Sequence, residues 1–231
     1  MAAASSGLGL ASAVALAAEG AHVVICGRDA ARLADAAAVV GHGCIPLVAD
    51  VGTAAGASAF VAAATDALGG IDILVANGGG PPPGNFESTP VDAYQGALDA
   101  NLLAIVAMCK AAVPAMQAQG WGRVVAITSL SVRQPMANLI LSNTARAGVT
   151  SFLKTLALEV ATSGVTVNTV QPGLHRTPRV EELYGADGAG ALRMGDAADF
   201  GAIVAFLCSE HAKFTTGLQL HVDGGAYTAL L

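Results

Sequence analysis

The sequence predicts an α/β fold, a Rossmann-type doubly wound parallel sheet in a three-layer αβα arrangement. Short β-branched runs alternate with longer Ala- and Leu-rich stretches whose apolar residues have helical spacing, as in repeated βαβ units. A Gly-rich turn stands directly before the first helix. At 231 residues, 54% hydrophobic and 12% charged, the chain can bury one large core. Because no internal repeat or linker is visible, residues 1–231 are expected to form a single domain.

The predicted strands are nearly all apolar, so we expect them to be buried on both faces. In chain order they are 22–26, 44–49, 73–76, 123–128, 166–170 and 219–222. The predicted helices are 8–19, 30–40, 54–68, 91–117, 138–162 and 197–208. The Gly- and Pro-rich stretch 78–90 is expected to be a loop. The polar, Gly-containing stretch 174–195 is expected to be mobile and is interpreted as a lid over the substrate.

Composition and charge argue against several functions. The net charge of −6 comes from scattered carboxylates, and the basic residues do not cluster, so no nucleic-acid partner is expected. No uninterrupted apolar run approaches a membrane span and the Ala-rich N-terminus lacks the features of a signal peptide, which predicts a cytoplasmic protein without a membrane partner. The four Cys and five His residues are dispersed, so no metal site is expected.

The first loop has the composition of a phosphate-binding turn. In Ala4-Ser5-Ser6-Gly7-Leu8-Gly9 the glycines allow backbone amides to approach a pyrophosphate, and the helix that follows offers the partial positive charge of its N-terminus. A Gly-rich turn that serves only helix packing is the alternative interpretation.

Further motifs follow this loop in a specific order. They are Asp50, Ala76-Asn77-Gly78-Gly79, Asn101, Ser129, Pro172-Gly173 and Val222-Asp223-Gly224-Gly225. In this order, and over essentially the whole length, the chain resembles the short-chain dehydrogenase/reductase family. The resemblance implies a dinucleotide cofactor, an adenine contact at Asp50 and catalytic roles for Asn101 and Ser129.

The choice of cofactor is predicted from the end of the strand at 22–26. An acidic residue there would bind the adenosine ribose hydroxyls and repel a 2′-phosphate, but Gly27 stands at this position and Arg28 follows. A guanidinium suits a phosphate, so NADP(H) is favoured over NAD(H). A solvated surface arginine is the alternative. The full predicted cofactor-binding set is Ser5, Ser6, Gly7, Leu8, Gly9, Arg28, Asp50, Val51, Asn77, Gly78, Gly79, Arg146, Pro172, Gly173 and Thr177.

The sequence departs from the family at the catalytic pair. The family's Tyr-x-x-x-Lys aligns with Ser142-Asn143-Thr144-Ala145-Arg146, a register set by the spacing from Ser129 and by Ala147-Gly148. An aliphatic hydroxyl is less acidic than a phenol and stops about 4 Å short of it. We hypothesise that a water held by Ser142 and Arg146 relays the proton. Arg146 keeps a positive charge, but its own proton is effectively fixed.

Two other interpretations of this site stay open. In the first interpretation, Ser142 and Arg146 have only structural roles. In the second, Tyr184 of the lid donates the proton in place of the missing tyrosine, although packing within the lid is a simpler role for it.

The sequence also departs from the family at its start. Only Met1-Ala2-Ala3 precede the loop, so the first, central strand is expected to be absent or truncated. Backbone groups of the neighbouring strands would then lack partners, and each unpaired group lowers the stability of the fold by about 1–3 kcal/mol if it is buried. We hypothesise that the natural product begins upstream or that this chain is a truncated form. Ala3 stands where the family has a Gly, and a positive φ there would cost about 1 kcal/mol.

These observations predict an oxidoreductase that transfers a hydride to or from a small carbonyl or alcohol substrate, similar to the 3-oxoacyl-thioester reductases. A homodimer or homotetramer is implied by the resemblance and by helices 91–117 and 138–162, which are apolar on several faces. The first alternative is a nucleotide-binding regulatory or scaffold protein without redox turnover. The second, ranked last, is a non-redox lyase.

Overall fold

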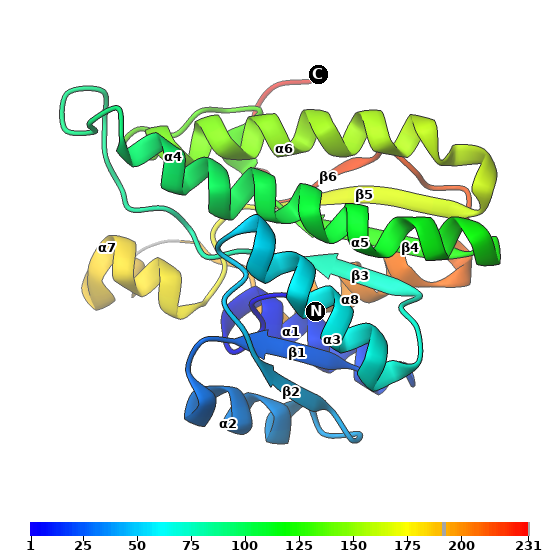
Figure 1. Cartoon of the computed structure of the whole chain (residues 1–231). Coiled ribbons are helices and arrows are strands. Elements are labelled where there is room, and N and C mark those ends of the chain that lie inside the picture. The colour runs from blue at the N-terminus through cyan, green and yellow to red at the C-terminus, as the bar shows by residue number, and fades with distance from the viewer. Residues whose placement is uncertain (191–192, 231) are drawn as a thin grey trace.

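The computed structural model of the chain describes residues 1–190 and 193–230, and it has helices on both faces of a parallel sheet (Figure 1). The strands are β1 (Val24–Gly27), β2 (Ile45–Val48), β3 (Ile73–Ala76), β4 (Gly122–Ile127), β5 (Val165–Pro172) and β6 (Gln219–Val222). They pair in parallel in the orders β1-β2 and β3-β4-β5-β6. The predicted fold class is confirmed.

The helices fall into two groups, each with its own apolar core against the sheet. One core is formed with α1 (Gly7–Ala18), α2 (Ala30–Val40) and α8 (Ala197–Cys208). The other is formed with α3 (Ala54–Leu68), α5 (Ala104–Gln119) and α6 (Ile140–Glu159). Further helical segments are α4 (Ala93–Leu98), the π-helical turn Asp99–Leu103, α7 (Pro178–Gly190), and the 3-10 turns Leu130–Val132, Ala161–Ser163 and Glu210–Ala212.

The first four residues form backbone hydrogen bonds to both β1 and β3. The amide of Ala2 donates to the carbonyl of Val75 in β3 at 3.1 Å, and the amide of Ala4 donates to that of Cys26 in β1 at 2.9 Å. Met1 to Ala4 therefore join the two parts of the sheet at one end. The prediction of a truncated first strand matches this arrangement.

Two local predictions were wrong. Strand β2, at the outer edge of the sheet, alternates between half-buried and exposed residues, so it is not buried on both faces. The long helix predicted at 91–117 is interrupted by the π-helical turn. In the segment 174–195, interpreted above as a lid, the structure has α7 with a break at Gly185, a helix that the sequence did not indicate; residues 191–192 lie outside the described part of the chain.

One helical stretch, Ala93–Gln119, is long and apolar enough to pass a test for a membrane span, with a mean hydropathy of 1.6. Half of that window is buried inside the structure, where α5 packs on α3 and on β3. A core helix of an α/β domain passes the same test, so this is weak evidence for a membrane segment.

Candidate functional site

The candidate site lies at the edge of the sheet where the parallel strands end. The loop before α1 lies at this edge beside the end of β1, because a Cβ on Gly27 would be 3.1 Å from the Ser5 side chain. Ser6, at the N-cap of α1, is exposed and makes no side-chain capping bond, so the first amides of the helix are free to bind an anion. This arrangement fits the pyrophosphate of a dinucleotide.

Gly9 fixes the shape of the loop through a close backbone approach. A Cβ on Gly9 would lie 2.7 Å from the Ala3 carbonyl oxygen and 2.9 Å from Nδ2 of Asn77. Those two groups are bonded to each other, since Nδ2 of Asn77 donates to the Ala3 oxygen at 3.0 Å. Asn77 therefore ties the end of β3 to the nucleotide loop.

Ala3 adopts a φ of 45°, a left-handed conformation that L-residues rarely take. This explains why the family has a Gly at this point. We expect Ala3→Gly to raise the free energy of unfolding by about 1 kcal/mol, measured by urea denaturation. Ala4 is also buried but has no positive φ, so Ala4→Gly should lower stability instead. Equal effects of the two substitutions would contradict the strain at Ala3.

The predicted adenosine end of the site is open to solvent. Arg28 follows β1, is exposed, and forms no ion pair within the described residues. Asp50 is also exposed, and its Oδ1 accepts a 2.9 Å hydrogen bond from the amide of Gly52. Val51 beside it is buried. A free guanidinium at this edge is compatible with a phosphate ligand.

The other side of the loop is covered by the segment after β5. A Cβ on Gly7 would lie 3.5 Å from Cγ2 of Thr177, so Thr177 lies over the start of α1. The amide of Gly173 donates to the carbonyl of Val222 at 3.0 Å, which holds the turn after Pro172 against β6.

Arg179 is a residue whose role the sequence did not indicate. Its Nη2 donates to the carbonyl of Pro81 at 2.8 Å, and Nη1 pairs with Glu182 at 2.9 Å. It therefore fastens the start of α7 to the Gly80-Pro81 loop. No motif marks such a contact between residues 98 positions apart.

The predicted catalytic residues come from three elements beside this loop. Asn101 is buried in the π-helical turn, with its Oδ1 3.8 Å from where a Cβ on Gly78 would be. Ser129 follows β4 and accepts a 3.1 Å bond from the amide of Ser131. Ser142 lies on α6, is 8% exposed, and its hydroxyl has no hydrogen bond within the described residues.

Arg146 lies one turn after Ser142 on α6 and is buried. Its Nη1 donates to the carbonyls of Ile127 and Thr128, both at 3.0 Å, which places the guanidinium under the end of β4. Burial, and secondarily the charge of Arg179, lower the pKa of Arg146 to about 10. The group is therefore still a cation at neutral pH, as the sequence predicted.

The expectation of reduced, unpaired cysteines fits the structure. Cys26, Cys109 and Cys208 are buried free thiols and Cys44 is half-buried, and burial raises the pKa of each. Among residues 1–190 and 193–230, no group of His, Cys, Asp and Glu is arranged to hold a metal ion.

Comparison with known proteins identifies the family. The family model described as Enoyl-(Acyl carrier protein) reductase matches residues 2–227. A relative from Sus scrofa, Dehydrogenase/reductase SDR family member 4, is 33% identical over 99% of this chain and 86% of its own length. The chain belongs to the short-chain dehydrogenase/reductase family. It is therefore an enzyme of the oxidoreductase class to which these relatives belong.

Two further members of the family are similar over nearly their whole length. The 3-oxoacyl-acyl-carrier-protein reductase FabG of Vibrio cholerae is 32% identical over 97% of this chain and 94% of its own. An NADPH-bound short chain oxidoreductase from Pseudomonas aeruginosa PAO1, described as containing an atypical catalytic center, is 28% identical over 99% of this chain and 95% of its own, with a TM-score of 0.90. This short-chain dehydrogenase/reductase thus shares its fold with an enzyme that binds NADPH.

Proposed function

We propose that this enzyme uses NADP(H) to reduce a small ketone or 3-oxo thioester, or to oxidise the corresponding alcohol. The observation that carries the cofactor assignment is Arg28 after Gly27, which is exposed and has no ion pair among residues 1–190 and 193–230. The NADPH-bound neighbour and the reductase from Vibrio cholerae support the cofactor and the substrate class. The loop of Ser5 to Gly9, with Asn77, Gly78, Gly79, Gly173 and Thr177, would hold the dinucleotide.

The bound cofactor supplies the hydride, so the protein must position the substrate and manage one proton. We propose that Ser142 and Arg146 occupy the positions of the family's Tyr and Lys. Ser129 donates to the substrate oxygen, and the charge of Arg146 stabilises the negative charge that develops there. The hydroxyl of Ser142 and the Arg146 nitrogens that bond to no described residue hold a water that delivers the proton, with Asn101 supporting that water.

The test of this proposal combines binding with turnover. NADPH and NADH are titrated by fluorescence, and NADPH oxidation is then followed against ketones and 3-oxo thioesters for the native chain and for Ser142→Tyr/Arg146→Lys. Turnover by the native chain supports the proposal. Tight NADPH binding with turnover only in the double variant would favour a regulatory protein without redox turnover. A failure to bind either nucleotide would contradict the proposal.

Cofactor preference should depend on Arg28. The substitution Arg28→Glu replaces a cation that faces the 2′-phosphate by an anion, so NADPH should bind about 100-fold more weakly, while NADH affinity is unchanged or improved. The charge-matched control is Lys110→Glu, an exposed position on α5. Equal weakening of NADPH and NADH binding by Arg28→Glu would show that the 2′-phosphate lies elsewhere.

We also propose a homodimer or homotetramer in the cytoplasm. Leu158 on α6 is 70% exposed and Leu103, just before α5, is 42% exposed, which fits helices that pack against a second copy. A monomer in sedimentation equilibrium at micromolar concentration would contradict this assembly.

A further inference from the structure

Arg179 is held on the loop that also approaches Asn101. A Cβ on Gly80 would lie 3.0 Å from Nε of Arg179, so the guanidinium packs directly on the loop after β3. Two residues earlier in this loop, a Cβ on Gly78 would lie 3.8 Å from Oδ1 of Asn101. Thr177, two residues before Arg179, lies over the start of α1. The guanidinium therefore lies close to both the nucleotide loop and the proposed catalytic residues.

A second guanidinium, that of Arg146, is close enough to interact with Arg179. Its Nη1 bonds to two carbonyls at the end of β4, and its Nε and Nη2 donate to no described residue. Neither of these nitrogens is a buried atom without a partner, so both reach accessible space. Burial, and then the charge of Arg179, lower the pKa of Arg146. The two cations therefore repel each other across a region that a ligand can enter.

The negative charge near these two cations is small. Among residues 1–190 and 193–230, no carboxylate pairs with Arg146, and Arg179 pairs only with Glu182. The Glu182 side chain is 67% exposed, and water screens an ion pair of this kind, so the pair is weak. Nη2 of Arg179 donates to the Pro81 carbonyl, which leaves its Nε for a ligand. An anion bound here would relieve the repulsion between the two arginines.

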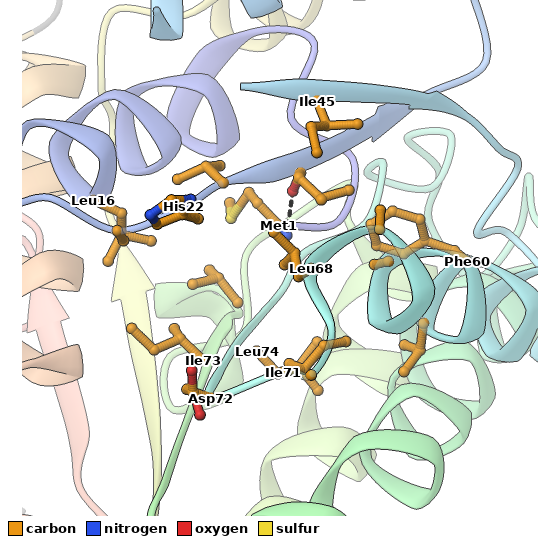
Figure 2. A pocket seen from close by; sticks show the side chains of 18 of the residues that line it. Met1, Leu16, His22, Ile45, Phe60, Leu68, Ile71, Asp72, Ile73 and Leu74 are labelled. Atoms are coloured by element: carbon orange, nitrogen blue, oxygen red, sulfur yellow. Dashed lines mark hydrogen bonds between the residues drawn. The ribbon is translucent and has the colours of Figure 1, made fainter. Parts of the chain in front are cut away.

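The cavity between β1 and β3 is a different place and does not suit an anion. Its volume is about 750 Å³, and Met1, Leu16, Phe60 and Asp72 are among the residues that line it (Figure 2). The lining includes no Lys or Arg side chain, and Asp72 contributes a negative charge. An anionic substrate is therefore expected at Arg146 and Arg179, and not in this cavity.

We propose that the substrate is a small 3-oxo acid, whose carboxylate is bound by Arg179 and attracted by the charge of Arg146. This inference rests on the proposed function, because it names the substrate class of the same site. Ser142 and Arg146 are neighbours one turn apart on α6, so the ketone oxygen and the carboxylate must also be close together in the substrate. In a 3-oxo acid, one methylene separates the two groups.

Glu182 competes with this carboxylate for Arg179. Replacing Glu182 by Gln removes the competitor, so the acid should bind more tightly. Replacing Arg179 by Gln removes the binding group, so the acid should bind more weakly. If the ion pair served only to hold the start of α7 in place, both substitutions would change the affinity in the same direction.

The first test measures the binding of an acid that cannot be reduced. 3-Methylbutanoate has nearly the shape of 3-oxobutanoate, and 3-methylbutanamide is its uncharged counterpart. Ligand-observed NMR titrations of the full chain in the presence of NADPH should show at least about tenfold tighter binding of the acid than of the amide. Arg179→Gln should remove this preference and Glu182→Gln should increase it. The control Lys213→Gln, at an exposed position, should leave it within about twofold of the native value.

The second test measures turnover with NADPH. For the native chain, kcat/KM should be at least about tenfold higher for 3-oxobutanoate than for 3-oxobutanamide, and Arg179→Gln should act mainly by raising KM for the acid. Equal affinity for 3-methylbutanoate and its amide, or a preference that Arg179→Gln leaves unchanged, would overturn the inference even if neutral ketones are reduced. An equal loss of NADPH affinity in Arg179→Gln would also overturn it, because Arg179 would then bind the cofactor. Binding of the acid through Arg179 without any turnover would contradict the proposed function alone.

Discussion

Replacing Arg146 by methionine should lower kcat/KM for NADPH-dependent reduction at least about 100-fold. The guanidinium is the buried cation fixed under the end of β4 beside Ser142, and its loss removes the charge that would stabilise the developing alkoxide. Because two backbone carbonyls also lose their donor, the variant should be destabilised by about 1–3 kcal/mol. Steady-state kinetics at a temperature well below the melting transition measure the first effect.

Two comparisons separate catalysis from structure. Arg146→Lys keeps the charge and should retain much more activity than Arg146→Met. Arg133→Met, at an exposed position after Ser129, should leave kcat/KM within about threefold of the native value. If Arg146→Met is destabilised yet keeps its kcat/KM, the residue acts only as a tether between α6 and β4.

Gly9→Ala should abolish most nucleotide binding, with an NADPH Kd at least about 100-fold higher. The new Cβ would meet the Ala3 carbonyl oxygen at 2.7 Å and Nδ2 of Asn77 at 2.9 Å, so the bond between these groups cannot survive in place. The loop and the first amides of α1 must then move away from the pyrophosphate. Isothermal titration calorimetry with NADPH measures the loss.

Gly96→Ala is the matched control for that experiment. Gly96 is in α4, and a Cβ there meets nothing within 4 Å, so the substitution should leave NADPH affinity unchanged and slightly favour the helix. Similar losses of affinity in both variants would show that the proposed contact at Gly9 does not position the loop.

Most of the fold could be predicted because its signals are local. Helices α2, α3 and α8 and strands β3 and β6 match the expected bounds, since each is an apolar run or periodic segment between clear turn residues. The break within 91–117 and helix α7 within 174–195 were missed. The π-helical turn around Asn101 contacts α6, a tertiary contact that no local pattern encodes, and the Gly-rich sequence of α7 gives little helical signal.

The candidate site was predicted as a set of positions, but its contacts were not. The sequence indicated Ser142, Arg146 and Asn77, and it raised the question of a positive φ at Ala3, which the structure has. The bonds of Arg146 to the end of β4 and of Arg179 to Pro81 depend on how distant segments pack, which no local pattern encodes. The cavity between β1 and β3 likewise follows from tertiary structure.

Isotope transfer by the native chain tests the central claim most directly. The protein is incubated with NADPH deuterated at both C4 positions and with each 3-oxo thioester or ketone, and the product is analysed by mass spectrometry. We predict one deuterium on the new carbinol carbon, formed well above the level given by Arg146→Met. Tight binding of the labelled NADPH with no deuterated alcohol above that background would contradict the account.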